Sequence, residues 1–287
     1  MKGIIVKKTV ILALYLLTAL LLSSTQLVAG SSHVTYTQNY QIDQDLNLNA
    51  VASLFGDSRD LYDFERRLND PYYQISNLDL NDDGYVDYLR VIETVDANLH
   101  FIVIQAVIGH RRYQDIATIE VDRNYDQTYI QVVGNTYIYG PNYIIEPRYS
   151  YRPQILNVFW KPRYYHAYRS TYRWRHYPSY YRPWRPVPLP YYHRHIRRHI
   201  SHANSYRYTR HRRVRHSRRM HHQIKRDDYA KRYPRRSYRH RTRTTKSEVK
   251  MKTQYRKDKK RAVRPTPRHK NRQKIQQKSI SRERSLY

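Results

Sequence analysis

One stretch of nine residues carries oxygen side chains at the alternate positions that a calcium ion requires. It reads Asp79-Leu80-Asn81-Asp82-Asp83-Gly84-Tyr85-Val86-Asp87. Calcium takes about six to eight oxygen ligands, and a loop with acidic or amide side chains at alternate positions followed by glycine can supply them. Gly84 permits the sharp turn, Tyr85 would offer its backbone carbonyl, and Asp87 would coordinate directly or through water. The predicted metal ligands are therefore Asp79, Asn81, Asp83, Tyr85 and Asp87.

This stretch resembles the calcium loops of the EF-hand and dockerin class, and the resemblance implies the same five ligands. The sequence departs from that class in two places. Arg90 stands where the class has a Glu or an Asp, and residues 88–92 look like a strand rather than a helix. We therefore predict a strand-flanked loop that binds a structural calcium ion with a dissociation constant of roughly 10⁻⁴ to 10⁻³ M. The alternative is an Asp/Asn/Gly turn that holds no metal.

A larger region resembles a known group of proteins. Residues 46–147 are similar to exported bacterial proteins of unknown function that carry a single calcium loop with the pattern DxNxDGxxD. The similar stretches are residues 63–69, 79–91 and 140–143. The resemblance implies export and the calcium loop, and it implies no activity.

The residues around the loop predict a small α+β domain. Leucines, Val51 and Phe55 recur at helical spacing over residues 46–55, and Leu61, Phe64 and Leu68 share a second helical face that Asp57 or Ser58 can cap. Four strand-like runs follow, over residues 88–95, 101–108, 116–121 and 129–133. Short links rich in Asp, Asn and Gly join them, which indicates an antiparallel meander with the two short N-terminal helices packed on it. The second run is apolar on both faces except at Gln105, so we expect it to be central.

The charge of the chain is divided between two halves. Residues 31–147 hold 18 Asp and Glu against 7 Lys and Arg, a net charge of −11. Residues 148–287 hold 5 Asp and Glu against 44 Lys and Arg, a net charge of +39. We call these the head domain (residues 31–147) and the basic half (residues 148–287). Such an asymmetry indicates that the basic half meets polyanions.

The basic half is predicted to lack a core of its own. Residues 148–200 are rich in Pro, Tyr, Trp and Arg, which favours an extended segment. Residues 201–287 are rich in Arg, Lys and His, and their few aliphatic residues predict a largely disordered tail, with short helices near residues 195–205 and 228–232.

Several partners suit a segment of this composition. Interleaved arginines and aromatic rings bind polyanions, and export directs the expectation to anionic envelope polymers or lipids rather than nucleic acid. The alternatives are contact with the protein's own head domain and a solvated polycation without a specific partner. His195, His199 and His202 share a helical face that could bind zinc or copper, but Arg194, Arg197 and Arg198 oppose a dication there.

The first 30 residues have the order of a secretory signal peptide. Lysines 2, 7 and 8 precede an uncharged apolar run over residues 9–22, and small residues at 28–30 provide a cleavage site before Ser31. An uncleaved anchor is the alternative. The chain has no cysteine, so disulfides do not stabilise it. We expect an exported protein in the periplasm, in the cell envelope or secreted.

No catalytic constellation is evident in the sequence. The nucleophile elbow, the zinc-protease motif and the phosphate-binding glycine loop are absent, and there is no cysteine nucleophile. His100 and His110 stand beside hairpin turns and are expected to be exposed, and Glu93 with Asp96 is expected to belong to a charged surface. The sequence therefore predicts a binding protein rather than an enzyme, with an uncharacterised hydrolase as the less favoured alternative.

Overall fold

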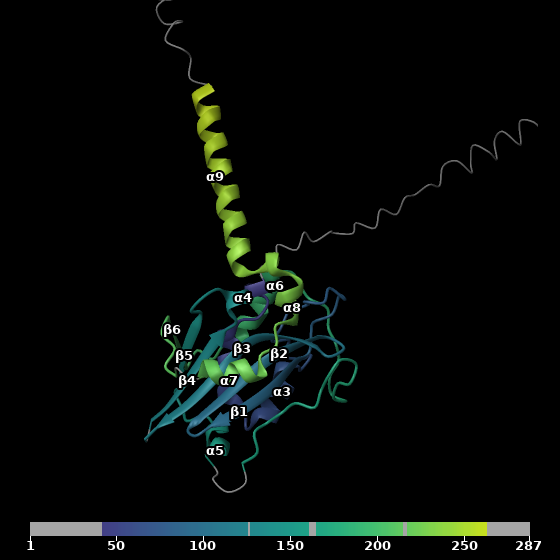
Figure 1. Cartoon of the computed structure of the whole chain (residues 1–287), viewed down its shortest axis with the longest axis vertical. Helices are drawn as coiled ribbons and strands as arrows, with labels where there is room; N and C mark the ends of the chain where they lie inside the picture. Colours follow the sequence, from purple (N-terminus) through teal and green to yellow (C-terminus); the bar gives the residue numbers. More distant parts are fainter. Residues whose placement is uncertain (1–41, 126, 161–164, 215–216, 263–287) are drawn as a thin grey trace, which may run out of the picture. The chain divides into compact units, whose positions relative to one another are not determined.

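A computed structural model describes residues 42–125, 127–160, 165–214 and 217–262 (Figure 1). The predicted signal peptide and the last residues of the tail lie outside these ranges. Among the described helices, none has the length and apolar character needed to cross a membrane.

A six-stranded antiparallel sheet forms the centre of the described chain, and its strands follow one another in chain order. The strands are β1 Leu89–Asp96, β2 Leu99–Gly109, β3 Arg112–Asn124, β4 Gln127–Gly134, β5 Ile144–Arg148 and β6 Ser205–Thr209. The predicted α+β class with an antiparallel sheet is confirmed. Strands β1 to β4 correspond to the four predicted runs, and β2 is buried along its whole length between β1 and β3.

Two helices cover one face of the sheet. Helix α2 (Leu48–Asp57) begins after Asn47, whose side chain accepts from the amides of Asn49 and Ala50. Helix α3 (Leu61–Leu68) is capped by Asp60, which accepts from the amide of Asp63. The prediction that Asp57 or Ser58 caps the second helix was therefore wrong. Asp57 is the last residue of α2, and residues 58–60 separate it from the start of α3.

Short elements make up much of the remaining chain. They are η1 Ile42–Gln44, α4 Thr136–Tyr139, α5 Ile155–Phe159, α6 Leu189–Ile196, η2 Arg197–His199, α7 Ser217–Ile224, α8 Asp228–Arg232, η3 Pro234–Arg236 and α9 Tyr238–Ala262. Helix α8 lies where a short helix was predicted. The other predicted helix, near residues 195–205, lies earlier in the chain as α6 and η2.

The described part of the tail differs from the predicted disorder. Strand β6 pairs with β5, so the sheet includes residues from both the head domain and the basic half. The expected boundary after residue 147 falls inside β5. The disorder was predicted from the small number of aliphatic residues in the basic half, but tyrosines there are buried instead. Tyr192 and Tyr229 are 1% and 2% exposed. Residues 263–287 lie outside the described residues.

Glu65 on α3 connects the head domain to the extended segment. Its buried carboxylate accepts from Tyr88 Oη at 2.9 Å, Tyr168 Oη at 3.0 Å, Ser170 Oγ at 2.6 Å and the Val91 amide at 3.0 Å. The backbone at residues 168–170 also bonds to β1 and covers its outer edge. Residues 168–170 are thus held by the carboxylate of Glu65, by that of Glu93 and by the backbone of β1.

Glu65 is expected to make stability depend on pH. Burial raises the pKa of Glu65 from 4.5 to about 7, although four donors point at its carboxylate. The folded chain therefore holds a proton that the unfolded chain has lost, and stability falls as pH rises between these values, by about 1.4 kcal/mol per pH unit. Glu65→Gln should remove this contribution in urea unfolding series at pH 5, 6, 7 and 8.

Asp96→Asn is the control, because Asp96 is an exposed carboxylate. Burial also raises the pKa of Asp45 to about 7, so the slope in Glu65→Gln should be reduced rather than abolished. An unchanged slope in Glu65→Gln would show that Glu65 is ionised in the folded protein at pH 5.

Candidate functional site

The predicted calcium loop lies between α3 and β1, and its own side chains bond to its backbone. The Asp83 amide donates to Asp79 Oδ1 at 3.1 Å and to Asn81 Oδ1 at 2.9 Å. The Gly84 amide donates to Asp79 Oδ2 at 2.9 Å, and the Tyr85 amide donates to Asp83 Oδ1 at 2.9 Å. Gly84 has a φ of +83°, a conformation that glycine adopts without strain. The loop thus brings Asp79, Asn81 and Asp83 together.

Asp87 enters the same loop from the protein interior. Its Oδ2 atom accepts from the Leu80 amide at 2.7 Å, and its side chain is almost fully buried. Its Oδ1 atom is buried with no hydrogen-bond partner among the described residues. Burial, with the nearby charges of Asp79 and Asp83, raises the pKa of Asp87 well above its usual range. A buried oxygen without a partner requires an explanation, and a bound cation is one.

The oxygen set suits calcium by type. Asn81, Asp83 and Asp87 line a cavity of about 150 Å³, and Trp174 and Tyr181 of the basic half line it as well. Within the described residues, however, no three His, Cys, Asp or Glu side chains already form a metal-binding group. Asp79 and Asp83 are turned toward backbone amides, and Asn81 is an amide. The unpartnered Asp87 Oδ1 atom is the feature that fits a cation.

Acidic residues on the second face of the sheet pair with arginines of the tail. Glu120 on β3 is 2% exposed and forms an ion pair with Arg212. Glu146 on β5 is 8% exposed and forms ion pairs with Arg207 and, at 3.0 Å, with Arg213. Burial raises the pKa of Glu120, and the charge of Arg212 opposes that shift. Some of the positive charge of the basic half is therefore paired with negative charge of the head domain.

Helix α7 covers the same face of the sheet and lies in front of the strands in Figure 1. Its Met220 packs with Val214 against Phe101 and Val103 of β2. Asp115 is buried beside it, and accepts from His221 Nε2 at 2.7 Å and Gln105 Nε2 at 2.7 Å. A buried strand face with acidic and amide groups is therefore covered by basic residues of the tail.

His100 and Glu93 do not lie on an exposed surface, and that expectation was wrong. His100 is 2% exposed, with its Nδ1 atom 2.7 Å from Glu93 Oε1 and its ring stacked on Phe159 at 4.4 Å. Glu93 also accepts from Tyr165 Oη at 2.6 Å and the Tyr168 amide at 2.7 Å. The expectation failed because it placed His100 in a turn, whereas β2 begins at Leu99 and carries His100 onto the covered face.

The three histidines of the proposed zinc or copper site do not gather around one point. His195 Nε2 lies 2.8 Å from the Tyr73 carbonyl, and the His195 and His199 rings lie 4.9 Å apart. Burial lowers the pKa of His199, and the nearby charges of His195 and Arg198 act in the same direction. His202 lies beyond η2 and is exposed.

Helix α9 carries a line of cations that the sequence reasoning missed. Five exposed basic residues follow at helical intervals, namely Arg239, Arg243, Lys246, Lys250 and Lys257. At about 100° per residue they fall within roughly 60° of the helix circumference. None of them forms an ion pair with a described carboxylate. On the opposite side, Arg241 donates to Asp43 and to the Ile138 carbonyl and fixes the start of the helix. We call the five residues the cationic stripe.

The signal for the stripe was present in the sequence as spacings of four, three, four and seven residues. A tail that is predicted to be largely disordered gives no reason to expect a continuous helix over residues 238–262, so this spacing alone did not indicate a charged helix face.

No protein-family model, curated protein or solved structure matches this chain. The resemblance to exported proteins with a single calcium loop therefore stays a prediction.

The ion pair between Arg212 and Glu120 should contribute strongly to stability. Arg212→Met leaves the buried Glu120 carboxylate without its positive partner, and we expect a loss of about 3–5 kcal/mol in urea unfolding. Arg212→Met combined with Glu120→Met removes both charges and should recover most of that loss. Arg219→Met, at an exposed position on α7, should change stability by less than about 0.5 kcal/mol. Equal losses in the single and double variants would contradict this account.

Proposed function

We propose that this protein is an exported, envelope-associated binding protein whose basic half attaches to anionic polymers or lipids. The observation that carries the proposal is the cationic stripe on α9. Helix α9 holds 11 Lys and Arg against 2 acidic residues. From Arg239 to Lys257 the stripe extends about 27 Å along the helix. A straight row of exposed charges can contact several anionic groups of one surface at the same time.

The ion pairs on the sheet support a division of roles among the basic residues. Arg207, Arg212 and Arg213 neutralise head-domain carboxylates and are committed to the fold. Within the described residues the stripe residues form no such ion pair, and we propose that their charge meets a partner. We also propose that the order of the tail depends on the head domain, so that a peptide of residues 201–287 alone is disordered.

Calcium is proposed as a structural ion of the head domain, held by Asp79, Asn81, Asp83, Tyr85 and Asp87. The unpartnered Asp87 Oδ1 atom supports this proposal. Burial and the nearby acidic charges raise the pKa of Asp79 and Asp87, and calcium, when bound, would favour the ionised form of both carboxylates.

We propose binding rather than catalysis. The buried Glu93–His100 pair acts as a structural tie, because Tyr165 and the Tyr168 backbone occupy the carboxylate. Extracytoplasmic nucleic-acid binding is the alternative function. Export rests on the signal-like residues 1–30 of the sequence.

Neutralising the cationic stripe should weaken binding to anionic vesicles. Each basic side chain near an anionic membrane contributes about 1 kcal/mol, so Lys246→Gln with Lys250→Gln should weaken binding by roughly tenfold or more. The measurement is co-sedimentation of the full chain with phosphatidylserine vesicles over a range of salt, and the variant should show a smaller salt dependence. The control, Arg152→Gln with Arg219→Gln, removes the same charge at exposed positions elsewhere.

Equal losses in the two double variants would mean that net charge alone governs binding. If a thymidylate oligomer displaces the protein from vesicles better than a polyanion of matched charge density, the nucleic-acid alternative is favoured.

Calcium should stabilise the folded chain. At 5 mM calcium and the dissociation constants given above, a site present only in the folded state adds about 1–2 kcal/mol. Thermal melts of the full chain in calcium and in chelator measure this effect. Asp87→Asn should abolish the difference, whereas Asp82→Asn should retain it, because Asp82 is not a predicted ligand. If the native chain has the same melting temperature in calcium and in chelator, the loop is a turn that binds no metal.

A further inference from the structure

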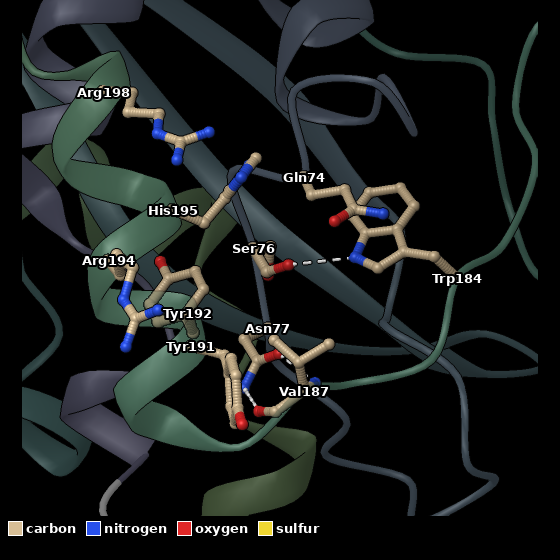
Figure 2. A pocket seen from close by; sticks show the side chains of 10 residues that line it. All are labelled: Gln74, Ser76, Asn77, Trp184, Val187, Tyr191, Tyr192, Arg194, His195 and Arg198. Carbon is tan, nitrogen blue, oxygen red and sulfur yellow. Dashed lines mark hydrogen bonds between the residues drawn. The ribbon is translucent and has the colours of Figure 1, made fainter.

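A pocket of about 270 Å³ lies where the extended segment crosses the loop that follows α3 (Figure 2). Gln74 and Asn77 line it from the head domain, and Trp184, Tyr191 and the arginines of α6 and η2 line it from the basic half. None of its lining residues is a carboxylate. The pocket shares no lining residue with the calcium loop or the cationic stripe, although the Trp184 carbonyl accepts from the Val86 amide of the loop at 2.9 Å.

Two arginines give the pocket its charge. Arg194 and Arg198 stand one helical turn apart, in α6 and η2, and both are exposed. Neither forms an ion pair with a carboxylate in the part of the chain that the structure describes. Like charges at this spacing repel each other, and an anion bound beside them would reduce the repulsion. Guanidinium groups also match the planar geometry of a carboxylate.

Aromatic rings give the pocket a flat wall that is held in place. Trp184 Nε1 donates to the Ser76 carbonyl at 3.2 Å, which fixes the indole (Figure 2). Asn77 holds Val187 through two hydrogen bonds of 2.8 and 3.0 Å. Tyr191 is 62% exposed at the other side of the pocket. The wall is therefore formed before any ligand arrives, which lowers the entropy lost on binding.

Gln74 supplies a polar group opposite the arginines. Its φ of +43° lies in the left-handed region, which non-glycine residues adopt at a cost. Its backbone amide donates to the Asp70 carbonyl at 3.0 Å in the turn that follows α3, which holds this conformation. Its side-chain amide faces the pocket beside Trp184 in Figure 2, and forms no hydrogen bond with a described residue. It can therefore donate to and accept from a hydroxyl group.

We propose that this pocket binds one carboxylate-bearing sugar ring of an anionic polysaccharide. Arg194 and Arg198 bind the carboxylate, Trp184 contacts the apolar face of the ring, and Gln74 bonds to a hydroxyl. The volume is slightly below the range of about 300–1,000 Å³ for small-molecule pockets, which suits a single ring better than a nucleotide. This inference rests on the proposed function, because it names the polymer class that the basic half meets.

The test measures binding of the full chain to tri-galacturonate by calorimetry, with maltotriose as the neutral probe and a thymidylate trimer as the nucleic-acid probe. We expect tri-galacturonate to bind, maltotriose to bind at least tenfold more weakly, and the thymidylate trimer to bind more weakly than tri-galacturonate. Arg194→Gln with Arg198→Gln should weaken tri-galacturonate binding at least tenfold. The charge-matched control Arg152→Gln with Arg219→Gln should change it less than twofold. Binding should also alter tryptophan fluorescence in the native chain and not in Trp184→Phe.

The inference is overturned if both double variants lose the same affinity, if maltotriose binds equally well, or if the thymidylate trimer binds more tightly. Vesicle binding separates this failure from failure of the proposed function. If the chain binds vesicles through the cationic stripe but does not bind tri-galacturonate, only the proposal of a sugar-binding pocket fails. If the chain binds tri-galacturonate at the pocket but does not bind vesicles, the pocket proposal is supported and the proposed attachment to lipid surfaces fails.

Discussion

Buried carboxylates that need partners from elsewhere in the chain are the constraint on which this structure depends. Glu65 and Glu93 lie under the extended segment, and Asp115, Glu120 and Glu146 lie under the tail. A buried charge without a partner is strongly destabilising. Tyrosine hydroxyls donate to the first two carboxylates, and histidine or arginine side chains pair with the other three. The basic half is therefore a structural component of the sheet domain as well as a source of surface charge.

Tyrosine suits this arrangement because it combines a large apolar ring with a hydroxyl group. Tyr168 reaches the carboxylate of Glu65, and Tyr192 bonds to the Ile75 carbonyl while its ring is buried. The chain contains 32 tyrosines and 4 phenylalanines. Burial and hydrogen bonding are achieved by the same side chains, which is why few aliphatic residues are needed in the basic half.

The sequence predicted those parts of the fold that depend on apolar periodicity. Strands β1 to β4 alternate or are continuously apolar, and their positions were found within a few residues. Strand β6, Ser205–Thr209, contains no aliphatic residue, and β5 contains Pro147, so neither has the pattern of a strand. Their existence depends on pairing between distant segments. The loop at Asp79 was recognised from local spacing, whereas the pocket at Trp184 joins residues about 110 positions apart and could not be found from spacing.

The pairing of β5 with β6 has a consequence for the order of events during synthesis. The two strands are separated by more than fifty residues, and the arginines that neutralise Glu120 and Glu146 lie at positions 207–213. A nascent chain that ends at β5 has its carboxylates in place and lacks their counter-charges. Contacts of such long sequence separation form slowly, and domains otherwise fold as the chain emerges. The final fold of the head domain is therefore reached only after the chain has been made as far as Arg213, because a shorter chain lacks strand β6 or some of the arginines that neutralise Glu120 and Glu146.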